Sequence, residues 1–272
     1  MSRVALVQLR ASRRKNENLR SAIEYIKEAK AKKAKLVCFP EFLMAYSPPD
    51  QTSDALARLA ETINGEFASA LKKAAKSNAI SVVATIYEKS RIKNRVYDTA
   101  LLIDKKGTLF SVYRKLHLYD ALGFKESAKL AAGKELVKPV RTHIGNIGMM
   151  ICYDVRFPEM SRMLALMGAN VLVMPSAWLE GEMKVEHWQT MLKARAIENG
   201  CFVVAPDQIG NIYIGHSMVV DPFGRITLDM REREGIGVVD LDNKLVNDVR
   251  KKLPLLKNRR SDIYSKYPAA DL

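Results

Sequence analysis

Three side chains capable of nucleophilic or acid–base chemistry each come directly after an apolar run: Glu41, Lys115 and Cys152. The carboxyl ends of neighbouring strands meet at one edge of a sheet, so these side chains could converge there. A cysteine can attack a poor electrophile such as an amide carbon, a carboxylate can move the protons, and a lysine can stabilise an oxyanion. Taken singly, however, strand-end charges are usually solvated and a cysteine is usually a small buried hydrophobe.

The elements that must position these residues alternate between strand and helix. Strands are expected where short runs are apolar or alternating, and helices where apolar residues recur every three to four positions. The expected strands cover residues 4–8, 36–39, 80–87, 96–104, 108–113, 146–152, 171–175, 201–207, 216–220, 225–229 and 236–240. The expected helices cover residues 17–34, 54–78, 157–167 and 184–199. This order predicts an α/β protein whose two similar halves share one core, as a single domain over residues 1–272.

Two hairpins are expected among the strand–helix units. The first turn is Lys105-Lys106-Gly107, and the second is Asp221-Pro222-Phe223-Gly224. Gly and Pro in these positions are typical of short connections between antiparallel strands. The sheets are therefore predicted to be mixed rather than purely parallel.

Composition and charge are those of an ordinary globular chain. Of the 272 residues, 48% are hydrophobic and 27% are charged, and the mean hydropathy is -0.13. The net charge of +14 raises the possibility of a nucleic-acid surface, but the basic residues are scattered without interleaved aromatic residues. No nucleic-acid partner is expected, although the positive field could help to collect a small carboxylate substrate.

Cysteine and histidine usage bears on location and metal binding. The three cysteines, Cys38, Cys152 and Cys201, lie far apart, and neither a signal peptide nor an apolar run of about 18 residues is apparent. These features predict a cytoplasmic protein without disulfides or a membrane partner. The histidines lack ligand spacing with any cysteine or carboxylate cluster, so neither a metal nor another cofactor is expected.

Together, residues 36–42, 112–118 and 148–159 resemble the nitrilase-like carbon–nitrogen hydrolase superfamily. The resemblance continues in the same order through residues 125–130, 187–188, 193–199, 215–224 and 259–264. It implies that Glu41, Lys115 and Cys152 form a catalytic triad and that the backbone N–H of Tyr153 completes an oxyanion hole. Glu126 matches a second glutamate that would orient Lys115 or the substrate, the alternative being a solvated loop carboxylate.

Four further residues near the nucleophile or the strand ends are candidates for the substrate pocket. Arg156 could bind a substrate carboxylate, since arginine matches that group with two parallel hydrogen bonds, the alternative being a structural ion pair behind the active site. Glu159 is expected to form a structural ion pair instead. Trp178 and Tyr46 are expected to form pocket walls, although aromatic residues near strand ends are more often part of the core.

The resemblance is strongest to the branch that contains omega-amidase and deaminated glutathione amidase. Residues 152–159, 194–199 and 215–224 carry it, whereas residues 42–52 and 177–181 depart from it. The expected reaction is release of ammonia from a small amide, the omega-amide of a 2-oxo dicarboxylate. Alternatives are a nitrilase, an N-carbamoyl amine amidohydrolase, or, from another class, a catalytically silent scaffold or binding protein.

The superfamily also implies an architecture and an assembly. The fold is expected to be a four-layer α-β-β-α sandwich with mixed sheets. Two such units would pair through helices into a homodimer, with extension to larger homo-oligomers in some members. The C-terminal tail, about residues 246–272, is expected to lie at that interface.

Overall fold

Two six-stranded mixed sheets pack face to face in the computed structural model, which describes residues 1–267. The first sheet has the order β14 (Gly235–Leu241), β1 (Ser2–Gln8), β2 (Leu36–Cys38), β3 (Ser81–Lys89), β4 (Val96–Ile103) and β5 (Leu109–Arg114). The second has the order β13 (Ile226–Asp229), β12 (Met218–Val220), β9 (Phe202–Ala205), β8 (Val171–Val173), β7 (Asn146–Met149) and β6 (Val140–Arg141). A separate two-stranded ribbon joins β10 (Ile209–Gly210) and β11 (Tyr213–Ile214).

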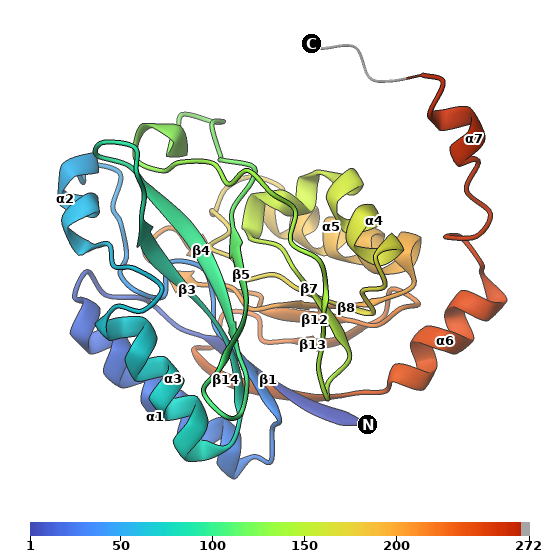
Figure 1. Ribbon diagram of the computed structural model, residues 1–272, viewed down its shortest axis with the longest axis horizontal. Coiled ribbons are helices and arrows are strands. Elements are labelled where there is room, and N and C mark those ends of the chain that lie inside the picture. Colours follow the sequence, from blue (N-terminus) through green and yellow to red (C-terminus); the bar gives the residue numbers. More distant parts are fainter. Residues whose placement is uncertain (268–272) are drawn as a thin grey trace.

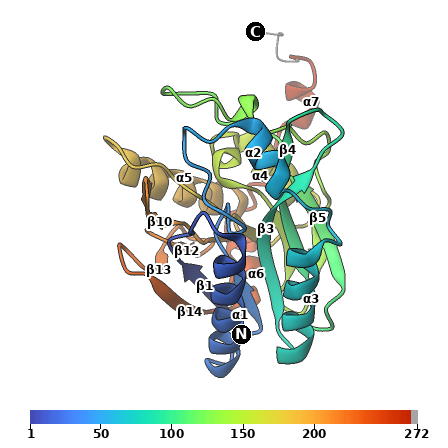
Figure 2. The ribbon, with the colours of Figure 1, turned by 90° about the vertical axis from the view of Figure 1, so that its left-hand side faces the viewer.

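Helices cover the outer faces of both sheets, which gives the four layers expected from the resemblance (Figures 1 and 2). The α-helices are α1 (Lys15–Ala31), α2 (Ser53–Leu59), α3 (Glu66–Asn78), α4 (Pro158–Leu166), α5 (Lys184–Asn199), α6 (Asn243–Lys252) and α7 (Ser261–Tyr264). Two short 3-10 helices are η1 (Glu126–Ala128) and η2 (Cys152–Arg156). None of the described helices combines the length and apolar character that crossing a bilayer requires.

Alternation along β1 shows how the layers are built. Val4 and Leu6 point into the core between the two sheets, whereas Ala5 and Val7 point into the core beneath α1 and α3. Successive side chains of a strand face opposite sides, so one strand serves both cores. The inter-sheet core contains residues from both halves of the chain.

The two halves use the same pairing pattern. In each sheet the three central strands are parallel, β1-β2-β3 in the first and β7-β8-β9 in the second, and antiparallel strands flank them. Both predicted hairpins are present, as β4–β5 and β12–β13. The short strands β6, β10 and β11 were not expected, since two residues are too few to show a period.

The helix expected over residues 54–78 is wrong in one respect, because it is broken into α2 and α3. Between them, Glu61 forms a bridge with Glu88 of β3, and its backbone N–H donates to Tyr87 O at 3.0 Å. The Glu61 side chain then accepts from Phe67 N at 2.8 Å and so caps α3. The apolar period continues across the break, which explains why the sequence pattern did not reveal it.

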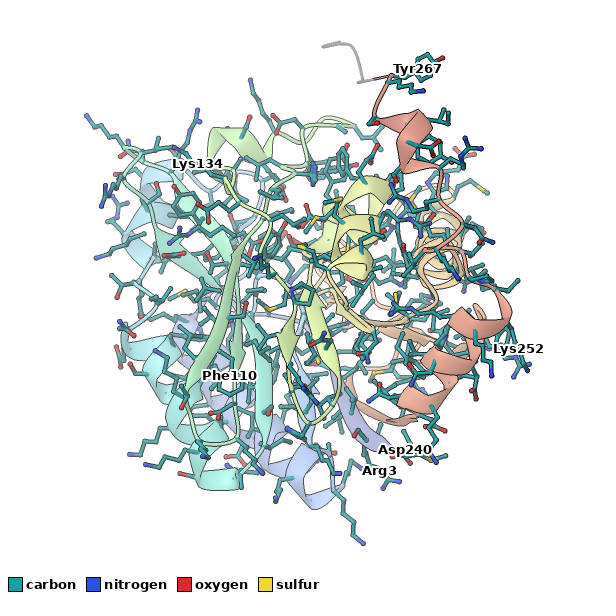
Figure 3. The ribbon with its side chains drawn as sticks, turned by 45° about the vertical axis from the view of Figure 1, so that its right-hand side comes forward. Arg3, Phe110, Lys134, Asp240, Lys252 and Tyr267 are labelled. Carbon is teal, nitrogen blue, oxygen red and sulfur yellow. The ribbon has the colours of Figure 1, made fainter. Side chains whose placement is uncertain are left out.

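The C-terminal segment differs in part from its prediction. α6 packs against the sandwich of the same chain, with Val246 and Val249 buried and with Arg250 Nη2 donating to Ala169 O at 2.6 Å. Only the chain after Lys252 leaves the sandwich, and it runs along the outside to Tyr267 (Figure 3). The remainder of the predicted tail, residues 268–272, lies outside the described residues.

Candidate active site

Three strand-end loops converge at one end of the two sheets. Glu41 follows β2, and its backbone N–H donates to Ser176 O at 3.1 Å across the inter-sheet space. Lys115 follows β5, and its backbone N–H donates to Asp98 O at 2.9 Å. Cys152 begins η2 after β7, with its backbone N–H donating to Pro175 O at 3.0 Å. Main-chain hydrogen bonds therefore fix each residue before its side chain is considered.

Lys115 is the centre of a buried charge cluster. Its Nζ donates to Glu41 Oε1 at 2.8 Å and to Glu126 Oε1 and Oε2 at 3.0 and 2.8 Å. The Lys115 side chain has no exposed surface and that of Glu41 is 1% exposed, whereas that of Glu126 is 19% exposed. Burial by itself would lower the pKa of Lys115, but the carboxylates of Glu126 and Glu41 more than offset this and raise it well above its usual range. The lysine is thus a fixed positive charge.

Glu41 keeps one oxygen free. Oε2 is buried and has no hydrogen-bond partner within residues 1–267. The Glu41 backbone carbonyl also accepts from Gln208 Nε2 at 2.8 Å, so the residue is held from the main chain and from Oε1. The free oxygen is the one available to accept a proton.

Cys152 occupies a left-handed backbone conformation, with φ of +41°. Residues other than glycine rarely adopt this region, and such strain is found where a side chain must be presented in a particular direction. Burial raises the pKa of the Cys152 thiol well above its usual range, the negative charge of Glu41 adds to the effect, and Lys115 opposes it. Burial and the charge of Glu41 therefore outweigh Lys115, and the thiol form of Cys152 is favoured in the free protein.

Asp154 ties the cysteine turn to the loop after Lys115. Its Oδ2 accepts from Ile151 N at 2.9 Å and from the Tyr113 hydroxyl at 2.6 Å, and its Oδ1 lies 2.7 Å from His117 Nδ1. Sequence analysis gave no role to Asp154. The available signal was its place two residues after the cysteine, within the segment that carried the resemblance.

A cavity of about 340 Å³ opens beside this cluster, which is the size of a small-molecule site. Cys152, Glu126, Tyr153, Arg156 and Trp178 are among the residues that line it. The Tyr153 N–H has no acceptor among the described residues and lies next to the thiol, as an oxyanion-hole donor requires.

Two residues considered in the sequence analysis, one expected in the pocket wall and one in an ion pair, lie outside the cavity. The ring of Tyr46 packs edge-on against Tyr213, with 6.2 Å between centroids, and it is Tyr213 that lines the cavity. Glu159 is exposed and forms no ion pair within residues 1–267, because the first turn of α4 directs it to solvent. The prediction of a structural ion pair there is wrong.

Lys184 was missed by sequence analysis although it lines the cavity. The residue is 8% exposed, and its Nζ donates to the Tyr119 hydroxyl at 3.2 Å and lies 5.8 Å from the Trp178 ring centroid. Arg156 approaches the same ring, with its Cζ 4.7 Å from the centroid. No carboxylate pairs with either cation in the described part of the chain. As the first residue of a helix, Lys184 gave no sequence signal.

Comparison with known proteins settles the class to which this arrangement belongs. The profile of the carbon–nitrogen hydrolase family matches residues 3–251. The chain belongs to this family. It is an amidase-like enzyme of the nitrilase superfamily, and its two six-stranded sheets match solved structures of that superfamily.

Similar proteins include named amidases. The deaminated glutathione amidase of Escherichia coli O157:H7 is 36% identical over 225 residues, which are 83% of this chain and 84% of that one. The C. elegans NitFhit structure has a TM-score of 0.90 at 33% identity and covers 97% of this chain, which spans 66% of NitFhit. A mutant of the amidase from Nesterenkonia sp. AN1 has a TM-score of 0.80 at 25% identity, covering 98% of this chain and 96% of its own. In that structure the acetamide moiety of fluoroacetamide is added covalently to the active-site cysteine.

Proposed function

We propose that this protein hydrolyses the terminal amide of a small oxo-acid, the omega-amide of a 2-oxo dicarboxylate, through a thioester on Cys152. The observation that carries this proposal is the pairing, in one cavity, of the Cys152 thiol with two cations that lack a carboxylate partner in the described residues, Arg156 and Lys184. Lys184 is buried and Arg156 is partly buried, and a cation removed from water without a counter-charge is costly, so a substrate carboxylate would satisfy them. The amidases among the similar proteins support the same class of reaction.

In the first half of the reaction, Cys152 Sγ attacks the amide carbon while its proton passes to Glu41 Oε2. The oxyanion that forms is stabilised by the charge of Lys115 and by the Tyr153 N–H. When this intermediate collapses, the carbon–nitrogen bond breaks and Glu41 returns the proton to the nitrogen, which leaves as ammonia. Because the resting cysteine is a thiol, the proton transfer accompanies the attack.

In the second half of the reaction, Glu41 takes a proton from a water molecule as the water oxygen attacks the thioester carbon. Collapse of the second tetrahedral intermediate breaks the carbon–sulfur bond, and the proton held by Glu41 returns to Sγ. The products are ammonia and a dicarboxylate. Glu126, hydrogen-bonded to Lys115 and Tyr119 N, holds the lysine in place.

The test is ammonia release from a panel of amides by the wild type, Cys152→Ala and the control Cys201→Ala, which removes a thiol remote from the cavity. We expect release from 2-oxo dicarboxylate omega-amides or deaminated glutathione, lost only in Cys152→Ala. Release confined to nitriles or N-carbamoyl amines would move the enzyme to another branch of the superfamily. No release from any compound would favour a catalytically silent scaffold.

Arg156 and Lys184 are tested on the same panel. Arg156→Gln and Lys184→Gln should each raise KM for the oxo-acid amides about 10- to 100-fold, the effect of losing a charge-assisted hydrogen bond. Turnover of an uncharged aliphatic amide should change little. Equal losses on charged and uncharged amides would contradict the proposed carboxylate contact.

We also propose that two copies of the chain pair through α4 and α5. Met163, Leu166 and Ile197 are 46%, 40% and 44% exposed on these helices, which bury Leu164 and Trp188 on their inner faces. Exposed apolar side chains gathered on one face mark an interaction surface. The segment after Lys252, with Leu253 and Leu255 exposed, would extend the same contact.

A further inference from the structure

Asp98, on strand β4 of the first sheet, is a buried carboxyl group that the proposed mechanism does not use. It is 1% exposed, and neither of its side-chain oxygens has a hydrogen-bond partner within residues 1–267. Glu41 Oε2 is orphaned in the same way. Buried polar atoms are normally satisfied, so two unsatisfied carboxyl groups in one place need an explanation.

The register of the sheet places Asp98 beside Glu41. Asp98 lies on the face of β4 that also carries Ala100 and Leu102, and both of these belong to the inter-sheet core. Its backbone carbonyl accepts from Lys115 N at 2.9 Å, which aligns it with the charge cluster. The carboxyl group of Asp98 neighbours that of Glu41, and the two can form a hydrogen bond only when one of them carries a proton.

The balance of buried charges around Asp98 favours its neutral form over its ionised form. Asp98 faces Glu41 from the loop after β2, Lys115 from β5, Glu126 from η1 and the Tyr87 ring from β3. Three carboxylates around one ammonium group would leave an uncompensated buried charge, which is very costly. Burial raises the pKa of Asp98 well above its usual range, and Glu41 adds to this more than Lys115 opposes it. A single proton shared by the carboxyl groups of Asp98 and Glu41 would give each of them a hydrogen-bond partner.

We propose that Asp98 is a positioning residue whose neutral carboxylic acid donates a hydrogen bond to Glu41 Oε2. This bond holds Glu41 ionised and in place from the side opposite Lys115, while a carboxylate oxygen retains a second lone pair for the Cys152 proton. The inference rests on the proposed role of Glu41 as the general base. It adds a fifth side chain to the group of Glu41, Lys115, Glu126 and Cys152.

Asp98→Asn and Asp98→Ala separate this role from simple packing. The asparagine keeps the shape and offers an N–H donor to Glu41 but cannot ionise, so we expect kcat within about threefold of wild type. The alanine removes the donor, so kcat should fall about 10- to 100-fold while KM changes little. The acid limb of kcat/KM should move to higher pH in Asp98→Ala alone, because the ionised base has lost a stabilising partner. Unchanged kcat and pH profiles in both variants would overturn the proposal.

A direct measurement that needs no substrate is the infrared carbonyl band of a protonated carboxylic acid at neutral pH. We expect the wild type and Cys152→Ala to show a component that Asp98→Asn removes. The control Asp221→Asn should leave it, since Asp221 Oδ1 already accepts from Phe223 N and Arg225 N. A wild-type spectrum that Asp98→Asn does not alter would overturn the proposal.

The infrared result also remains informative if Asp98→Ala fails to fold. If the enzyme shows no Cys152-dependent turnover, the proposed function fails while the infrared band still reports the state of Asp98. If the enzyme is active but the infrared band is absent, only the proposal about Asp98 is contradicted.

Discussion

At the scale of single residues, the site consists of groups whose pKa values are shifted upward by burial and by neighbouring charges. Cys152 is a thiol in a left-handed backbone conformation, Lys115 is a buried cation, and Asp98 is a buried acid against Glu41. The pKa of each group depends on its burial and on the charges of its neighbours. Disturbing one group should therefore change how another titrates.

The stability of Asp98→Asn should depend on pH differently from that of the wild type. The pKa of Asp98 is raised on folding, so its contribution to stability is complete below the unfolded value of about 4 and is lost as pH rises toward the folded value. The Asp98→Asn variant has no such loss of stability as pH rises, because asparagine does not ionise. The free energy of unfolding of Asp98→Asn minus that of wild type should thus grow between pH 5 and 8, by at most about 1.4 kcal/mol per pH unit. Urea unfolding at several pH values measures it, and a constant difference would contradict the raised pKa.

Thiol accessibility distinguishes the three cysteines. Cys152 is 8% exposed and lines the cavity, whereas Cys38 and Cys201 are fully buried, and burial raises the pKa of Cys201 to about 12. Iodoacetamide should therefore alkylate Cys152 first in the native protein, which peptide mass spectrometry detects. Cys152→Ala supplies the control, because the fast phase should vanish. Equal rates at all three thiols would argue against a functional cavity at Cys152.

At the scale of elements, helix and strand ends carry the site, and their caps determine how firmly it is held. α3 ends at Asn78, and the capping residue that follows, Ala79, has a left-handed φ of +46° although it is not glycine. This cap precedes β3, the strand next to β4.

Ala79→Gly should stabilise the protein by about 0.5–1 kcal/mol, because glycine adopts the left-handed conformation without steric cost. Thermal or urea unfolding measures the change. The matched control is Ala70→Gly inside α3, where the same substitution should cost about 1 kcal/mol. Destabilisation at both positions would show that the cap is not strained.

At the scale of the whole molecule, two similar halves close around one inter-sheet core and bring the ends of β2, β5 and β7 together. The chain after Lys252 is the part least bound to this body: Leu253, Leu255, Tyr264 and Tyr267 are 40–77% exposed. A segment of that kind is suited to contact with a second copy.

Deleting residues 253–272 should yield a folded monomer, whereas the full chain should be a dimer or a larger oligomer. Cutting before Arg250 would instead remove the hydrogen bonds from Arg250 to Ala169 O and Gly200 O and destabilise the fold. Sedimentation or light scattering reports the mass. Met163→Glu on α4 should also dissociate the oligomer, and Lys27→Glu on exposed α1 should not. A truncated protein that keeps the full oligomeric mass would refute the predicted role of the tail.

The sequence alone determined the class of the protein and the positions of its principal side chains. Glu41, Lys115 and Cys152 could be found because each ends an apolar run, and both hairpins because their turns carry Gly or Pro. α5 was predicted over its observed range, Lys184–Asn199. Such signals are local, since they depend on spacing within a few residues and on the conformational limits of the backbone.

Only the tertiary structure decided how these side chains act on one another. Asp98 and Glu41 are 57 positions apart and meet because β4 pairs with β3 and β3 with β2. The same packing breaks the helix at Glu61, places Tyr213 rather than Tyr46 on the cavity wall and turns Lys184 toward the cavity. Burial and charge interaction depend on what surrounds a group in space, and a local pattern of residues carries no measure of either.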